Sequence, residues 1–215
     1  MRSLNDRHTA AKIAPLKVRD LTTAAGLTRA AKSLNASPED MVRFYAYSKG
    51  FIEEDPRLGD ISIGKSSGGD FYDIDKNRIA LSSPDPDIFA HEMGHAERLH
   101  DSSGFYKGVL KGSKAVSSML SLGSIPIGGA VTYSEGISNK AKKNLLRGLA
   151  GASALAALPN LVEEVGATTK ALSKSTESLR SLKRLAPGLA SHSFHGLSGP
   201  ATYYLFSKLN KERRG

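Results

Sequence analysis

The sequence contains no cysteine among its 215 residues. This absence excludes disulfide bonds, thiolate nucleophiles and metal sites with sulfur ligands, and it leaves the redox compartment open. A bound metal ion would therefore need histidine, carboxylate or water ligands.

The chain also lacks a repeat of fixed period. No apolar run follows the basic residues of the first 16 positions, so we do not expect a cleaved secretion signal.

Composition and charge limit the class of protein. Hydrophobic residues make up 40% of the chain and charged residues 24%, which fits a folded protein rather than a disordered one. The net charge of +9 would suit nucleic acid, an anionic membrane surface or an acidic substrate. Basic residues concentrate after position 105 and flank the hydrophobic stretches, which favours the membrane surface. Nucleic acid is not an expected partner, because no base-stacking or recognition-helix pattern occurs.

The residue pattern predicts an N-terminal helical segment at 1–55 and a second domain at 56–215. Within the first segment we expect helices at 9–18, 21–34 and 37–51, the last with Ser37 as N-cap and proline in its first turn. Short alternating runs at 60–63 and 78–81 predict two antiparallel strands.

Two uncharged apolar stretches follow at 115–133 and 148–162, and a polar helical run follows them at 163–184. The first stretch is nearly long enough to span a bilayer but contains serines, glycines and a proline. The second has only 15 residues, or roughly 22 Å of helix. The sequence thus permits either a membrane-embedded hairpin at 115–162 or a buried core hairpin.

The segment HEMGH at 91–95 matches the HExxH pattern of zinc peptidases. Residues four apart share one face of a helix, so His91 and His95 can reach the same ion. Glu92 would lie beside the open coordination position, where it can accept a proton from the attacking water. Asp85, followed by a proline, predicts a helix that begins just before the motif and runs to about position 100.

A catalytic zinc site needs a third protein ligand. Asp101 follows His95 at a spacing that some zincins use, but Arg98 stands where those proteins need glycine. His100 is one residue short of that spacing. Glu163 and Glu164 are better candidates, because they begin a predicted helix with small residues on one face. A carboxylate at such a helix start could also serve only to complement the helix dipole.

The order of motifs resembles the YugP-type neutral zinc metallopeptidases, bacterial membrane-associated gluzincins distantly similar to the HtpX-type proteases. The resemblance covers roughly 70–172. It consists of FYD at 71–73, HEMGHA at 91–96, the two apolar stretches and EVGATTKA at 164–171, with a weaker match in ATYY at 201–204.

The resemblance implies a zinc metalloendopeptidase with His91, His95 and Glu164 as Zn²⁺ ligands and Glu92 as general base. It implies a mostly helical (α+β) zincin-like core with a small antiparallel strand pair and a hydrophobic helical hairpin. A protein or peptide substrate would add to an edge strand at 77–82, and the protein would be membrane-associated, or otherwise cytoplasmic. The alternative is a non-catalytic membrane-associated or structural protein that retains a zinc site.

Other residues are weaker candidates. His192, His195, Tyr203 or Tyr204 could donate a hydrogen bond to the transition state. The segment GDISIGKS at 59–66 satisfies the Walker A pattern, but a second strand rather than a helix is expected after it, so nucleotide binding is not expected.

Overall fold

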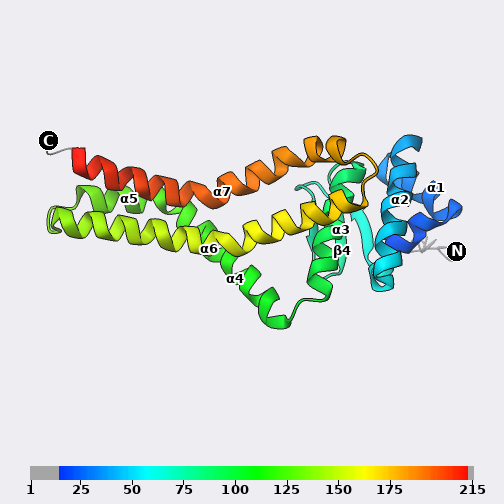
Figure 1. Ribbon diagram of the computed structural model, residues 1–215, viewed down its shortest axis with the longest axis horizontal. Helices are drawn as coiled ribbons and strands as arrows, with labels where there is room; N and C mark the ends of the chain where they lie inside the picture. The colour runs from blue at the N-terminus through cyan, green and yellow to red at the C-terminus, as the bar shows by residue number, and fades with distance from the viewer. Residues whose placement is uncertain (1–14, 213–215) are drawn as a thin grey trace, which may run out of the picture.

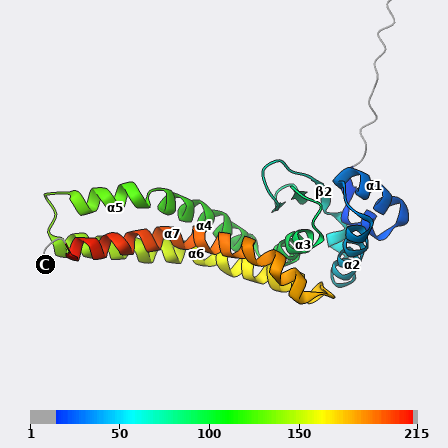
Figure 2. The same ribbon diagram turned by 90° about the horizontal axis from the view of Figure 1, so that it is seen from above.

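A small head and a long helical arm make up the protein (Figures 1 and 2). The computed structural model describes residues 15–212, apart from the side chains of 188, 191–196 and 210–212. The described chain begins in the head and ends at the far end of the arm (Figure 1). The fold is mostly helical with a small four-stranded sheet.

The head begins with β1 (Leu16–Lys17), the 3-10 helix η1 (Val18–Thr22), α1 (Ala24–Leu34), α2 (Pro38–Glu54) and η2 (Pro56–Asp60). Helix α2 starts as predicted: the Ser37 hydroxyl accepts the Asp40 N–H at 3.1 Å, and proline occupies the first turn. The helix predicted at 9–18 is wrong where it can be compared, because its last residues form β1 and η1. The rest of it lies outside the described residues.

The sheet is mixed, with strand order β1-β2-β4-β3. Strands β2 (Ser62–Lys65) and β4 (Arg78–Leu81) pair in parallel, whereas β1 with β2 and β3 (Phe71–Asp73) with β4 pair antiparallel. The prediction of a simple antiparallel strand pair is therefore wrong. The two predicted strands, β2 and β4, are neighbours in the sheet. Between them in the sequence the chain first forms the outer strand β3, and β4 then lies between β2 and β3.

A tight turn after β3 accounts for this topology. The Asp73 carboxylate accepts the N–H groups of Asp75 and Lys76 at 3.1 and 3.2 Å, and Asn77 adopts a left-handed conformation with φ 47°. The chain thus reverses and lays β4 between β2 and β3. As a consequence 77–82 is not an edge of the sheet, contrary to prediction; the edge strands are β1 and β3.

The hydrophobic core of the head includes residues on both sides of position 55. Phe44 of α2 packs on Phe89 of α3 (Pro86–His100) with ring centroids 5.0 Å apart, and both are fully buried. Burial of each such ring contributes roughly 1.5–3 kcal/mol. This packing fixes the position of α3, the helix that carries the HExxH motif, against α2.

A buried polar cluster at the start of α3 joins the head to the arm. The fully buried Asp87 carboxylate accepts hydrogen bonds from Tyr47 at 2.8 Å and Ser181 at 2.6 Å and pairs with Arg43. Burial raises the pKa of Asp87, but the hydrogen bonds from Ser181 and Tyr47 and the charge of Arg43 outweigh burial and hold it below its usual value.

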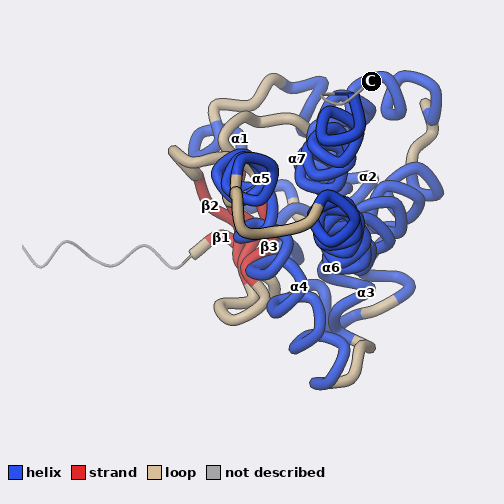
Figure 3. The backbone as a smooth tube through the Cα atoms, turned by 90° about the vertical axis from the view of Figure 1, so that its left-hand side faces the viewer, coloured by secondary structure: helices blue, strands red, loops and turns tan. Residues whose placement is uncertain are grey.

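Four helices form the arm: α4 (Gly104–Leu122), α5 (Ser124–Tyr133), α6 (Asn139–Lys174) and α7 (Ser178–Glu212). Helices α6 and α7 lie side by side (Figure 1). Seen along the arm, α5, α6 and α7 lie at the corners of a triangle (Figure 3). Because α6 is one continuous helix, Glu163 and Glu164 do not begin a helix as predicted. The dipole explanation for these two carboxylates is thereby removed.

The arm keeps much of its apolar surface exposed, so 115–162 is not a buried core hairpin. Helix α4 has no buried residue, and only 17% of the apolar window of α6 is buried. By length and composition α6 could cross a membrane, as could the bent pair of α4 and α5 taken together. Large exposed side chains on the arm include Met119, Leu122, Ile125, Leu155 and Leu158.

Candidate metal centre

Helix α3 carries the first two candidate ligands. Asp85 caps the helix by accepting the N–H groups of Asp87 and Ile88 at 2.8 and 3.4 Å, as predicted. The apolar face of α3 is buried in the head. Because of the helical repeat, His91 and His95 lie together on the opposite face, with ring centroids 4.7 Å apart. That face meets α6.

Close packing of α3 on α6 depends on small residues. A side chain at Gly94 would bring its Cβ within 3.0 Å of the Ala167 Cα and closer still to the Ala167 carbonyl oxygen. Both residues are fully buried at this crossing. Two charged pairs, Glu97 with Lys170 at 2.6 Å and Arg98 with Glu163 at 3.2 Å, connect the same helices. The resulting short separation lets α6 carboxylates reach the imidazoles.

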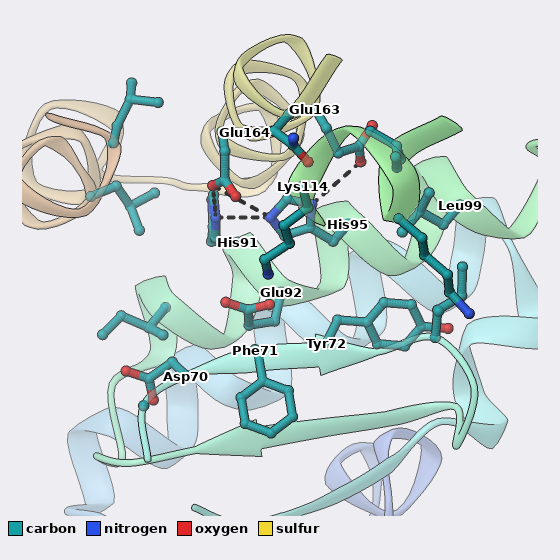
Figure 4. A pocket seen from close by; sticks show the side chains of 18 of the residues that line it. Asp70, Phe71, Tyr72, His91, Glu92, His95, Leu99, Lys114, Glu163 and Glu164 are labelled. Carbon is teal, nitrogen blue, oxygen red and sulfur yellow. Dashed lines mark hydrogen bonds and ion pairs between the residues drawn. The ribbon is translucent and has the colours of Figure 1, made fainter. Parts of the chain in front are cut away.

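Three donor atoms converge at this crossing (Figure 4). His91 Nε2 lies 3.2 Å from His95 Nε2, and Glu164 Oε2 lies 3.3 and 3.6 Å from these two nitrogens. Around a tetrahedral zinc ion with Zn–N and Zn–O bonds of about 2.0–2.2 Å, ligand atoms would be separated by about 3.3–3.6 Å. The spacing and chemistry of the three donors therefore fit a zinc ion.

The second nitrogen of each imidazole also has a partner. His95 Nδ1 lies 3.3 Å from Glu163 Oε1, and His91 Nδ1 lies 3.2 Å from Thr168 Oγ1. Both partners can accept a hydrogen bond from an Nδ1–H group, which leaves Nε2 unprotonated and able to bind a metal. A carboxylate behind a metal-binding histidine is a recurrent feature of zinc sites. Glu163 and Glu164 thus have different positions, one behind the imidazole and one beside both Nε2 atoms.

The cluster is electrostatically suited to a cation. Burial lowers the pKa of His95, but hydrogen bonds with Glu163 and Glu164 and the charge of Glu92 raise it to about 10. Burial raises the pKa of Glu92, against the opposing influence of the two imidazoles. Three carboxylates around two imidazoles favour a positive charge among them, whether a proton or a metal ion supplies it.

A cavity of about 600 Å³ opens beside the three donors. It is bounded by α3, α4, α6 and α7 and by the segment that leads into β3. Figure 4 shows Glu92 between the imidazoles and β3, where Phe71 and Tyr72 lie. The Tyr72 backbone N–H donates to the Glu92 carboxylate. Glu92 is therefore held at the boundary of the donor cluster and the cavity.

The other predicted candidates lie elsewhere or outside the description. Asp101 is exposed and pairs with Arg57 at 2.5 Å, and His100 contacts Asn77 at 3.4 Å, so neither joins the donor group.

Tyr203 is buried in the arm and donates to the Leu120 carbonyl at 3.4 Å, and the Lys208 ammonium group lies over the Tyr204 ring, 5.2 Å from its centroid; neither tyrosine lines the cavity. The side chains of His192 and His195 are outside the described residues. Residues 59–66 run from the end of η2 through β2, and the next element is the strand β3 rather than a helix, as predicted.

Sequence reasoning did not find the supporting residues. Thr168 follows Glu164 by four positions on α6, the same spacing that places His91 and His95 on one face of α3, but threonine alone carries no metal signature. Tyr106 and Arg98 both donate to Glu163 Oε2, at 3.0 and 3.2 Å. These contacts link distant parts of the chain and need the folded structure to be recognised.

Comparison with known proteins found no matching family model, no similar curated protein and no similar solved structure. The similarity to YugP-type metallopeptidases consequently stays a prediction from the motifs.

Proposed function

We propose that the protein is a zinc-dependent metallopeptidase in which His91, His95 and Glu164 bind the metal and Glu92 acts as general base. The observation that carries the proposal is the triangle of His91 Nε2, His95 Nε2 and Glu164 Oε2, with sides of 3.2, 3.3 and 3.6 Å. Two imidazoles and one carboxylate form a ligand set of known zinc peptidases.

An open coordination position favours catalysis over a purely structural site. Structural zinc sites are closed by four protein ligands, whereas catalytic sites use three and keep one position for water or substrate. Here three donors face a cavity large enough for a peptide segment. A zinc ion supplies Lewis acidity, which polarises a carbonyl group and makes water more acidic.

The chain's own groups would complete the reaction. Glu92 is held by the Tyr72 N–H beside the imidazoles, where its carboxylate can accept a proton from the attacking water and pass it to the leaving amine. Water rather than a side chain is the nucleophile, so we expect no covalent enzyme intermediate. A trapped acyl-enzyme would contradict this mechanism.

The substrate would bind along β3 rather than along 77–82. Strand β3 is an edge of the sheet and contributes Phe71 and Tyr72 to the cavity lining. An extended peptide can pair with such an edge through main-chain hydrogen bonds. This arrangement would place a peptide bond of the substrate between β3 and the donor cluster.

We also propose that the arm associates with an anionic membrane. Its exposed apolar side chains and the span-length helix α6 support this location, and Lys140, Lys143 and Arg147 add positive charge near the beginning of α6. Flotation of the purified protein with vesicles that contain an anionic lipid is the direct test. Protein that remains at the bottom of the gradient with every lipid composition would contradict membrane association.

Metal analysis tests the core of the proposal. We expect about one zinc per chain in the wild type after purification with zinc, and its loss in His95→Ala and Glu164→Ala. Glu92→Gln should retain the metal but lose peptidase activity by about 100-fold or more. Absence of zinc in the wild type under these conditions would contradict the site. Retention of function in Glu92→Gln would instead favour a non-catalytic protein that keeps zinc for stability.

A further inference from the structure

Three lysines on α4 line the same cavity as the metal donors. Lys107, Lys111 and Lys114 are spaced by four and three residues, so they share one face of the helix. Figure 4 shows Lys114 extending from α4 into the cavity, in front of His95 and above Glu92. The part of the cavity lining that α4 contributes therefore carries a row of positive charge.

Two of these lysines have no acidic partner within the described part of the chain. Lys111 pairs with Asp75 at 2.7 Å, whereas Lys107 and Lys114 take part in no ion pair there. The acidic residues of the lining already have other partners: Asp70 with Ser82, Glu92 with the Tyr72 N–H, Glu163 with His95, Arg98 and Tyr106, and Glu164 with both imidazoles. The cavity wall thus presents two ammonium groups for a ligand.

The position of the lysines along α4 also points to the cavity rather than to a lipid environment. All three precede residue 115, after which α4 has no charged side chain up to its end at Leu122. Val116, Met119 and Leu122 of that second half are exposed and do not line the cavity, whereas the three lysines line the cavity beside the donor cluster. Two unpaired positive charges beside a reaction site raise the local concentration of anionic ligands.

We propose that Lys107 and Lys114 bind acidic side chains of the substrate, so that the enzyme prefers peptides with aspartate or glutamate close to the bond that is cleaved. This inference rests on the proposed peptidase function. It assigns the lysines of α4 a role in substrate choice. A glutamate side chain beside the scissile bond would form an ion pair with a lysine ammonium group, whereas a glutamine side chain carries no charge to pair with it.

A binding experiment tests the preference without requiring cleavage. The ligand is a decapeptide that carries two glutamates on each side of a central Ala-Leu bond and an uncharged fluorophore; its partner peptide has glutamines instead. Fluorescence anisotropy with zinc-loaded, full-length Glu92→Gln protein gives the affinity for each. We expect the acidic peptide to bind about five- to tenfold more tightly at low salt, and the difference to shrink as salt screens the charges.

Charge-matched variants identify the residues. Adding Lys107→Gln and Lys114→Gln should reduce the preference to less than about twofold. The control adds Lys32→Gln and Lys49→Gln, which remove the same charge from exposed positions of α1 and α2, and it should leave the preference unchanged. Equal binding of the two peptides, or an equal effect of both double variants, would overturn the proposal.

The remaining outcomes separate this proposal from the function on which it rests. If the wild type binds the acidic peptide selectively through these lysines but cleaves no peptide, the acidic subsite stands and the peptidase function fails. If Lys107→Gln/Lys114→Gln reduces binding to phosphatidylcholine–phosphatidylglycerol vesicles while the peptide preference persists, the lysines bind lipid headgroups. That result would overturn the substrate proposal and leave the metal site untouched.

Discussion

Replacing Glu163 with glutamine gives a sharp test of the metal centre, because it alters support for a ligand without removing a ligand. The carboxylate accepts from His95 Nδ1 through Oε1 at 3.3 Å and from Arg98 and Tyr106 through Oε2 at 3.2 and 3.0 Å. A glutamine side chain has one acceptor oxygen and one donor NH₂ group, so it cannot satisfy both sides.

Either orientation of the amide disturbs the site. With its oxygen toward His95, the NH₂ group faces the donors of Arg98 and Tyr106. With its oxygen toward Arg98, the NH₂ group faces His95 Nδ1 and favours the tautomer that carries its proton on Nε2, where the metal should bind. Loss of such support typically weakens metal binding 10–100-fold, or about 1.4–2.7 kcal/mol.

Competition with a chromophoric zinc chelator measures this change directly. We expect Glu163→Gln to weaken zinc binding 10–100-fold and Glu164→Gln to weaken it far more, since in the proposed site only Glu164 of the two supplies a ligand. Tyr106→Phe is the matched control: it removes one hydrogen bond but keeps the Glu163 carboxylate, and its effect should stay below about threefold. Equal losses in Glu163→Gln and Glu164→Gln would refute the assignment, as would an unchanged affinity in Glu163→Gln.

Three further predictions concern the support around the site. Thr168→Val removes the acceptor for His91 Nδ1, so zinc affinity in the chelator assay should fall about tenfold while the circular dichroism spectrum is preserved. Gly94→Ala forces α3 and α6 apart and should lower the free energy of unfolding by about 1–3 kcal/mol in urea, whereas Gly148→Ala, with open space around it, should not. The folded-state pKa of Asp87 is lowered, so its stabilisation is present above the unfolded value of about 3.9 and is lost as pH falls through the folded value. Asp87→Asn should therefore lower the free energy of unfolding by about 3 kcal/mol at pH 7 and make it less dependent on pH in the acid range. If the free energy of unfolding of the variant fell with acid as steeply as that of the wild type, this reasoning would be contradicted.

The sequence predicted those parts of the fold that depend on local signals. The caps at Ser37 and Asp85 define helix starts through residues within three positions, and the structure confirms both. The pairing of β4 with β2 depends on long-range contacts, and hydrophobic alternation at 78–81 contains no information on strand order or direction. The continuity of α6 was missed because its apolar and polar halves look like separate segments.

In the candidate site, too, the features set by local spacing could be predicted from the sequence, and those set by long-range contacts could not. Spacing alone placed His91 and His95 on one helix face, and their convergence is present in the structure. The order of motifs, through the family resemblance, favoured Glu164 over Glu163 as a ligand, and in the structure the Glu164 carboxylate lies with the two imidazole nitrogens in the candidate donor group. The support from Thr168 joins residues 77 positions apart. Such contacts depend on how α3 and α6 cross, which neither helix determines by itself.

The candidate metal centre belongs to the head and to the arm at once. His91 and His95 lie on α3, which is fixed in the head core, whereas Glu164 and both supporting residues, Glu163 and Thr168, lie on α6. A shift of α6 by one residue would rotate its side chains by about 100° and move all three out of reach together. The head alone would therefore retain the complete HExxH motif but only two of the three candidate ligands. For this reason the candidate metal centre requires α6, the described helix that is long and apolar enough to cross a membrane, and α6 would bring this centre close to any membrane that the arm enters.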